Sequence, residues 1–399
     1  MTTSVPAETA LEPGAASAAA SSSAVPTRRT SFHPLTVAEV RRLTEDAIEV
    51  TFAVPEALEG SFDYLPGQYV ALRTTLDGAE IRRSYSICAE PKPGEIRVAI
   101  KRDLGGKFST WANENLKAGD VLDVMSPTGG FISKHPMTAL NHPEDIDVTD
   151  ENVFVAVAAG SGITPVISIA RTVLAASENV RFDLVYANKA AMDVMFLEEL
   201  ADLKDKYPAR FAVHHVLSRE QRISPLLSGR IDAEKLSALI ESVLPTRDVD
   251  EWFLCGPFEL VQLCRDTLAE RGVDSEKVRF ELFTTGQPGK PEGQIGRPIQ
   301  VDPSADNFEI SFRLDGLQGK VASPTHARES ILNAALRVRP DVPFACAGGV
   351  CGTCRAKVVS GTVEMEENYA LEPDEIEKGY ILTCQSRPTS PEVTVDYDA

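Results

Sequence analysis

The chain has 399 residues, of which 43% are hydrophobic, and its formal net charge is −19 at pH 7. This length predicts two or three domains rather than one core, and so acidic a balance argues against nucleic acid or an anionic membrane surface as the partner. Seven cysteines without a secretory signal indicate a reducing, cytoplasmic compartment in which thiols stay free or bind metal.

Two segments resemble, respectively, an export signal and a membrane span. Residues 1–31 are rich in Ala, Ser, Thr and Pro, and no apolar stretch follows the Arg28–Arg29 pair, so we expect a disordered tail rather than an export signal. Residues 153–170 carry no charge and have the length of a membrane span. A β-branched stretch is followed there by Gly160, Gly162 and Pro165, which instead predicts a buried strand, a tight turn and the start of a helix.

Residues 32–135 predict an antiparallel β-barrel, because apolar and polar side chains alternate in short runs between turn residues. A helix is expected from Thr110 to Leu116, directly after a glycine turn. The strands expected in this region include 37–40, 48–52, 69–72 and 96–100.

Two motifs within this barrel predict a flavin site. Arg83 offers a charge-assisted fork for a phosphate. Tyr85 offers a ring to cover an isoalloxazine, and Ser86 offers a hydrogen-bond donor toward the polar edge of that isoalloxazine. The turn from Gly106 to Ser109 places N–H groups at a helix N-terminus, where they suit a pyrophosphate. Each motif alone is also common in an ordinary strand or turn, so their order and spacing carry the prediction. The expected flavin contacts are Arg83, Ser84, Tyr85, Ser86, Ile100, Lys101, Gly106, Lys107, Phe108 and Ser109.

Residues 152–283 predict a Rossmann-like α/β domain, in which a parallel sheet carries helices on both faces. Expected strands alternate with helical stretches and lie at 153–157, 182–186, 212–217 and 251–254. Gly160, Gly162 and Thr164 follow the first strand directly, as in turns that approach a dinucleotide phosphate. A plain turn of any α/β domain is an equally good interpretation of this motif alone.

Two further strand ends in the α/β domain carry candidate nucleotide contacts. Cys255, Gly256 and Pro257 follow the strand at 251–254, although a small buried thiol is the common role of such a cysteine. Ser218 and Arg219 end the strand at 212–217 and are placed to bind a 2′-phosphate, which favours NADPH over NADH. A solvated loop arginine is the alternative.

Four cysteines near the C-terminus predict a [2Fe–2S] cluster. Their spacing is C-x4-C-x2-C, with a fourth cysteine after 29 intervening residues, which is the plant-type pattern. The three glycines among the first three cysteines allow the backbone to approach the cluster closely. Structural zinc usually needs two C-x-x-C pairs or histidines, and neither is present in this segment. The expected ligands are Cys346, Cys351, Cys354 and Cys384.

The strands and the helix expected around these cysteines indicate an α+β, β-grasp ferredoxin domain over residues 307–399. Alternating apolar residues predict strands near Phe308–Phe312 and Val393–Val395, residues 380–384 have strand character, and residues 329–336 have helical character. Residues 284–306 contain four glycines and several prolines without apolar periodicity, which predicts a linker. We therefore expect the ferredoxin domain to move between the flavin and an external partner.

Taken together, these motifs resemble the ferredoxin–NADP reductase superfamily over Phe32 to Phe283, followed by a plant-type ferredoxin. The resemblance implies FAD in the barrel, a nicotinamide dinucleotide in the α/β domain, and Cys255 near the position of hydride transfer. It also implies catalytic roles for Tyr85 and Ser86 and a segment ending at Phe283 that closes over the flavin. Residues 132–151 form a longer insertion than this family pattern contains.

The domain order is similar to that of the reductase components of multicomponent oxygenases. Residues 32–40 and 361–372 look most like the reductases of phenylacetyl-CoA epoxidases, and the reductases of steroid-ring hydroxylases are the alternative. The resemblance implies that two electrons enter as a hydride and leave singly through the cluster to an oxygenase component. An oxygenase in its own right is excluded, because the sequence has neither a Glu-x-x-His pair nor the Cys-x-His step of a Rieske centre.

The segment between Cys354 and Cys384 is acidic, with three basic residues against seven acidic ones. A solvated charged loop is the common interpretation of such a run. Its position between two expected ligands suggests instead that it steers a basic partner toward the cluster. The acidic residues are Glu364, Glu366, Glu367, Glu372, Asp374, Glu375 and Glu377.

Overall fold

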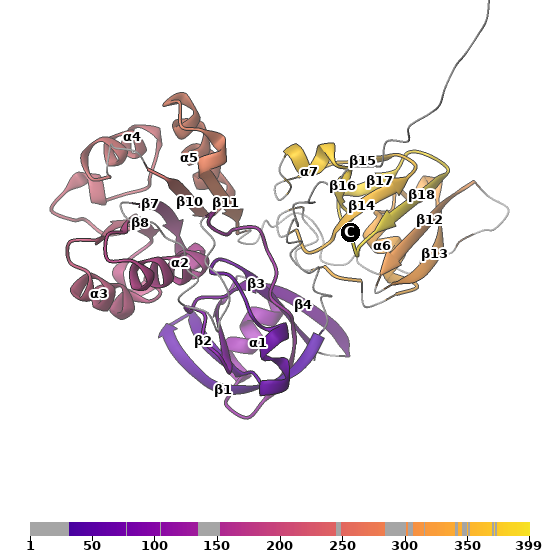
Figure 1. Ribbon diagram of the computed structural model, residues 1–399, viewed down its shortest axis with the longest axis horizontal. Helices are drawn as coiled ribbons and strands as arrows, with labels where there is room; N and C mark the ends of the chain where they lie inside the picture. Colours follow the sequence, from indigo (N-terminus) through magenta and orange to yellow (C-terminus); the bar gives the residue numbers. More distant parts are fainter. Residues whose placement is uncertain are drawn as a thin grey trace, which may run out of the picture.

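The computed structural model has three domains that follow one another along the chain (Figure 1). It describes residues 32–76, 78–103, 105–134, 152–244, 249–283, 301, 306–314, 316–339, 342–344, 349, 352–368, 371 and 373–399. The expected tail at 1–31, most of the expected linker and nearly all of the 132–151 insertion therefore lie outside the described residues. No described helix combines the length and apolar character needed to cross a bilayer.

The first domain is the predicted antiparallel barrel, and its sheet order is β4-β3-β6-β1-β2-β5. Alternate residues face its core, so Val70 and Leu72 are fully buried inside while Tyr69 and Ala71 pack on the opposite face. The helix of this domain begins at Lys107 rather than at Thr110, because the glycine turn ends at its N-cap. The elements are β1 (Phe32–Thr44), β2 (Ala47–Ala53), η1 (Glu56–Ser61), β3 (Tyr69–Leu76), β4 (Ala79–Ser86), β5 (Glu95–Lys101), α1 (Lys107–Asn115) and β6 (Val121–Met125).

The second domain is the predicted parallel sheet, and its strand order is β11-β10-β7-β8-β9. Side chains of β7 alternate between two apolar layers, with Phe154 facing the α2 side and Val155 the α4 and α5 side. This double burial explains why the strands read as nearly continuous apolar runs. The elements are β7 (Val153–Ala159), η3 (Gly160–Gly162), α2 (Ile163–Ala176), β8 (Arg181–Asn188), η4 (Ala191–Asp193), α3 (Leu197–Lys206), β9 (Phe211–Leu217), η5 (Pro225–Leu227), α4 (Ala233–Ser242), β10 (Glu251–Gly256), α5 (Phe258–Glu270), η6 (Ser275–Lys277) and β11 (Val278–Leu282).

The barrel and the α/β domain share one core at their junction. Phe131 of the barrel belongs to the same apolar cluster as the buried face of α2. The Ser168 hydroxyl on α2 donates to the Ala89 carbonyl of the barrel at 2.6 Å, and Arg171 Nη1 donates to the Cys88 carbonyl at 3.0 Å. These contacts fix the α/β domain against the barrel.

The third domain has the predicted β-grasp form, with a main sheet in the order β13-β12-β18-β14-β16 and α6 packed on it. Strands β12 and β18 pair in parallel, and Phe312 lies opposite Val395. Helix α6 begins at Ile331, later than expected, because the Ser330 hydroxyl caps it by accepting the Asn333 N–H. The elements are β12 (Asn307–Leu314), β13 (Leu317–Pro324), η7 (Thr325–Ala327), α6 (Ile331–Leu336), β14 (Arg355–Ser360), β15 (Val363–Met365), α7 (Pro373–Glu377), β16 (Tyr380–Leu382), β17 (Ser386–Pro388) and β18 (Glu392–Asp396).

Candidate functional site

The expected flavin residues lie on β4 and at the start of α1. The Tyr85 ring packs 5.7 Å from that of Phe108, measured between centroids, and burial raises the pKa of its phenol. Desolvation also raises the pKa of the Asp103 carboxyl, while Arg83 and Lys101 oppose that shift by their positive charge. Arg83 and Lys101 therefore lie near Asp103, and Arg83 and Asp103 lie near Tyr85. Asp103 is a member of the site that the sequence analysis missed.

The turn before α1 is tightly built and presents backbone N–H groups. A Cβ at Gly106 would lie 2.5 Å from Ser109 Oγ, so a larger residue here would displace that hydroxyl. The Ser109 hydroxyl is buried, accepts the Asp103 N–H at 3.1 Å and donates to the Gly106 carbonyl at 3.3 Å. Within the described chain no side chain caps this helix N-terminus. The turn thus fits a bound pyrophosphate, whose oxygens would accept the N–H groups of α1.

Four of the expected flavin contacts have side chains that face the barrel core, lie near a carboxylate or are exposed. Ile100 and Phe108 fill the barrel core. Lys101 Nζ lies 3.6 Å from an Asp46 carboxylate oxygen, and Lys107 is exposed.

The glycine turn after β7 packs against the end of β10. Gly160 has a φ of +54°, a conformation that glycine adopts without strain. A Cβ at Gly162 would lie 2.3 Å from the Cys255 carbonyl oxygen, so the close packing of the two strand ends excludes any larger residue. Thr164 is buried, and its hydroxyl donates within the turn to the Ser161 carbonyl at 2.9 Å. Its described hydrogen bond therefore shapes the turn.

The carboxyl edge of the sheet meets the barrel at one point. Cys255 on β10 lies opposite Glu281 on β11 in the parallel register. The Ser86 hydroxyl on β4 donates to Glu281 Oε2 at 3.3 Å. Burial raises the pKa of the Glu281 carboxyl to about 7, although the Ser86 hydrogen bond opposes the shift, and burial raises the pKa of the Cys255 thiol. Three polar groups from three strands thus converge, and Glu281 was not among the expected site residues.

The remaining nucleotide candidates lie at the same edge of the sheet. Ser218 and Arg219 are exposed directly after β9. Pro257 is the N-cap residue of α5. The Phe283 N–H donates to the Gly256 carbonyl at 2.9 Å, and the Phe283 ring packs against the shared core of the first two domains.

Two of the four expected cluster ligands lie among the described residues. Cys354 and Cys384 are both buried in the core of the third domain. Thr383 ties them together, because its N–H and its hydroxyl both donate to the Cys354 carbonyl, at 3.1 and 2.8 Å. Cys346 and Cys351 lie outside the described residues. Cys384 follows β16 in a turn rather than lying within the expected strand.

One contact joins the expected cluster loop to the barrel. The Thr353 hydroxyl lies 2.9 Å from the Tyr69 hydroxyl and 3.4 Å from the Ser84 hydroxyl. Thr353 precedes the expected ligand Cys354, and Ser84 stands between Arg83 and Tyr85 on β4. The third domain therefore meets the barrel beside the expected flavin residues (Figure 1).

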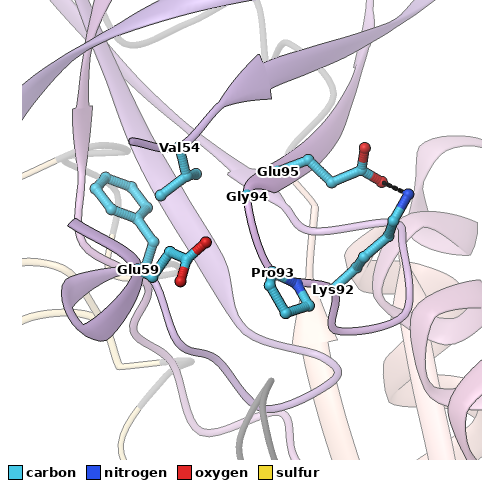
Figure 2. A pocket seen from close by; sticks show the side chains of 7 residues that line it. Val54, Glu59, Lys92, Pro93, Gly94 and Glu95 are labelled. Carbon is cyan, nitrogen blue, oxygen red and sulfur yellow. Dashed lines mark ion pairs between the residues drawn. The ribbon is translucent and has the colours of Figure 1, made fainter. Parts of the chain in front are cut away.

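A shallow depression elsewhere on the barrel contains none of the expected site residues (Figure 2). An ion pair of 3.4 Å between Lys92 and Glu95 lies at its edge. It is lined by Val54, Glu59, Phe62, Lys92, Pro93, Gly94 and Glu95.

Comparison with protein families assigns each domain. Residues 34–132 match the model of an oxidoreductase FAD-binding domain, and residues 156–266 match that of an oxidoreductase NAD-binding domain. Residues 316–389 match a 2Fe-2S iron-sulfur cluster binding domain. The fold and its sites thus define an oxidoreductase with FAD-binding, NAD-binding and [2Fe–2S] domains.

Relatives of known function share this whole arrangement. One subunit of the 1,2-phenylacetyl-CoA epoxidase of Escherichia coli strain K12 is 42% identical over 93% of this chain and 99% of its own length. The ferredoxin reductase component of the 3-ketosteroid-9-alpha-monooxygenase of Rhodococcus rhodochrous is 33% identical over 91% of this chain and 96% of its own. The chain belongs to this family of three-domain oxygenase reductases.

A solved structure has the same modular fold. Phthalate dioxygenase reductase, described as a modular structure for electron transfer from pyridine nucleotides to [2Fe-2S], aligns with a TM-score of 0.52 and 22% identity. The alignment covers 92% of this chain and 98% of that one. The fold predicted from the sequence, with a barrel, an α/β domain and a β-grasp domain, is confirmed.

Proposed function

We propose that this protein is the NADPH-dependent reductase component of a phenylacetyl-CoA epoxidase and that it works in the cytoplasm. The observation that carries the proposal is the pair of contacts on β4. Ser86 contacts Glu281 of the nucleotide domain, and Ser84, two residues away on the same face of the strand, contacts Thr353 of the ferredoxin domain. A cofactor held beside β4 would therefore lie next to both neighbouring domains.

The residues around β4 have the chemistry to hold the first cofactor. Arg83 and the N-terminus of α1 would bind the phosphates of FAD, and the Tyr85 ring would cover its isoalloxazine. Ser86 and Cys255, together with Glu281, would border the position of hydride transfer. When bound, FAD would accept a hydride from the nicotinamide and release its electrons one at a time.

The nucleotide and the cluster would be held by the other two domains. The turn from Gly160 to Thr164 and the strand end at Gly256–Pro257 would receive the dinucleotide, with Phe283 closing the site. Ser218 and the exposed Arg219 would bind the 2′-phosphate, which is why we propose NADPH. The expected ligands of the cluster are Cys346, Cys351, Cys354 and Cys384.

Reconstitution tests this function. The purified chain with FAD and its cluster is mixed with NADPH, phenylacetyl-CoA and the oxygenase subunits of a phenylacetyl-CoA epoxidase, and the epoxide is measured. The oxygenase of a 3-ketosteroid-9-alpha-hydroxylase with its steroid is the comparison, because the reductase of such a system is 33% identical to this chain. Turnover with the steroid system alone would replace the epoxidase assignment, and turnover with neither would remove both.

A further inference from the structure

The Thr353 hydroxyl lies between a turn of the ferredoxin domain and two strands of the barrel. The Arg355 N–H donates to the Gly352 carbonyl at 3.0 Å, and Gly352 has a φ of +68°, so residues 352–355 form a tight turn. Within this turn the side chain of Cys354 is buried in the ferredoxin core, whereas Thr353 reaches the barrel. The loop thus directs an expected cluster ligand inward and its neighbour outward.

The barrel side of this contact lies on the outer face of β3 and β4. Tyr69 pairs with Ser86, and Ala71 pairs with Ser84, in the antiparallel register. Tyr69 and Ala71 pack together away from the barrel core, so the two serines share that outer face. Ser84 and Ser86 are about 6.6 Å apart along the strand. The nucleotide domain and the ferredoxin domain therefore dock on adjacent positions of one strand.

We infer that the Tyr69, Ser84 and Thr353 hydroxyls form a reversible docking contact, and that the cluster loop must leave it before the ferredoxin can pass electrons to an external protein. The inference rests on the proposed function. Thr353 directly precedes the expected ligand Cys354 and lies against the barrel, so the barrel covers the loop surface beside that ligand. A partner protein that takes electrons across this surface needs it uncovered. Neutral hydroxyl groups exchange their hydrogen bonds for water at little net cost, which suits a contact that opens in each cycle.

A disulfide that locks this contact tests the inference. The Ser84→Cys/Thr353→Cys variant places two thiols where two hydroxyl oxygens now lie 3.4 Å apart. Rotation of the two side chains has to bring the sulfurs to the disulfide bond length of about 2.05 Å. Diamide takes up the two electrons and two protons of the two thiols as the bond forms. The matched control is Ser84→Cys/Ser360→Cys, because Ser360 is an exposed residue of β14. Free-thiol counting and gel mobility measure the cross-link without reference to activity.

In the locked protein, electron transfer from NADPH to the cluster should continue, while transfer from the cluster to an external protein should fall. NADPH should bleach the cluster absorption equally well in the disulfide and dithiol forms of this one variant, since the docked state is the one that receives electrons; comparing the two forms removes any effect of replacing Ser84. Reduction of cytochrome c, used as the protein acceptor, should fall by at least about tenfold, because that acceptor must reach the covered loop. A phosphine reductant that opens the disulfide should restore it.

Two results would overturn the inference. One is a cross-link yield no higher than that of the Ser360 control, which would mean that the contact is not populated. The other is full cytochrome c reduction by the locked protein, which would mean that the docked loop is accessible. Failure of the proposed function is a separate result: the unmodified protein would show no bleaching with NADPH, while the cross-link yield would still report the contact.

Discussion

The buried Glu281 carboxyl gives the molecule a stability that depends on pH. Its pKa is about 7 in the folded chain, against an ordinary value of 4.5. Because the folded pKa is the higher one, the folded state keeps a proton that the unfolded state releases between these values. The stabilisation is complete below pH 4.5 and is lost as the pH rises through 7.

The size of this effect follows from the two pKa values. A difference of one pKa unit corresponds to about 1.4 kcal/mol, so the full shift from 4.5 to about 7 is worth at most about 3.5 kcal/mol. Of this, about 2 kcal/mol is lost between pH 5.5 and pH 8. Glutamine has nearly the same shape and does not titrate. The Glu281→Gln variant should therefore lose about 2 kcal/mol less than the parent over this range.

Urea unfolding at several pH values measures this difference. A Trp111→Phe background in both proteins leaves Trp252 on β10, beside β11, as the reporter. Ser86→Ala is the control, because it removes the hydrogen bond that lowers the Glu281 pKa and should move the transition to higher pH. Parallel stability curves for the parent and E281Q would refute the reasoning.

Three further predictions concern the proposed sites. Cys354→Ser or Cys384→Ser should abolish cytochrome c reduction but leave NADPH-dependent ferricyanide reduction intact, and a full cluster spectrum in either variant would contradict the ligand assignment. Arg219→Ala should lower kcat/KM for NADPH by roughly 10- to 100-fold and leave that for NADH unchanged, as expected for loss of a charged hydrogen bond; equal use of both coenzymes by the parent would contradict it. Glu364→Lys/Glu377→Lys should slow electron delivery to the oxygenase at low salt and have little effect at high salt, because surface charges steer association and are screened.

The cysteine and glutamate variants have matched controls. Cys264→Ser removes a buried cysteine of the nucleotide domain and should leave the cluster spectrum unchanged. Glu234→Lys/Glu259→Lys makes the same change in net charge on exposed positions of α4 and α5. If this control slowed oxygenase reduction as much as the ferredoxin variant, the effect would come from net charge alone.

Local patterns predicted most of the fold. Continuous β-branched runs indicated the strands of the parallel sheet, since both faces of that sheet are buried. Strand β11 (Val278–Leu282) was missed because it alternates apolar with charged residues, unlike the continuous apolar runs that marked the other strands of this sheet. The carboxyl of its Glu281 is removed from water in the folded chain and accepts a hydrogen bond from Ser86, 195 residues away. No short-range signal marks such a residue.

For the acidic segment between Cys354 and Cys384, the net charge counted from the sequence does not predict which acidic residues are paired in the folded chain. From the sequence, its seven acidic residues oppose only three basic ones. In the structure Asp374 pairs with Lys378 at 2.7 Å, and Glu375 pairs with Arg355 at 3.3 Å. Glu366 pairs with Arg387, which lies beyond the segment. The steering hypothesis therefore rests on other acidic residues, which is why Glu364 and Glu377 are the exposed positions to reverse.

The two junctions of the barrel differ in the groups that form them. On the nucleotide side, the buried Glu251 accepts from the Ser133 hydroxyl and from the Lys134 N–H at 2.8 Å, and Arg41 bridges Glu49 and Glu199. Separating those surfaces would leave a buried carboxylate without these hydrogen-bond donors, at a cost of several kcal/mol.

On the ferredoxin side, the described hydrogen bonds join neutral hydroxyls, whose exchange for water costs about 1 kcal/mol or less each. Motion should therefore occur where the ferredoxin meets the barrel, while the barrel and the nucleotide domain stay together. A protein that must receive electrons at one surface and deliver them at another needs this difference, because only one of its two junctions has to open.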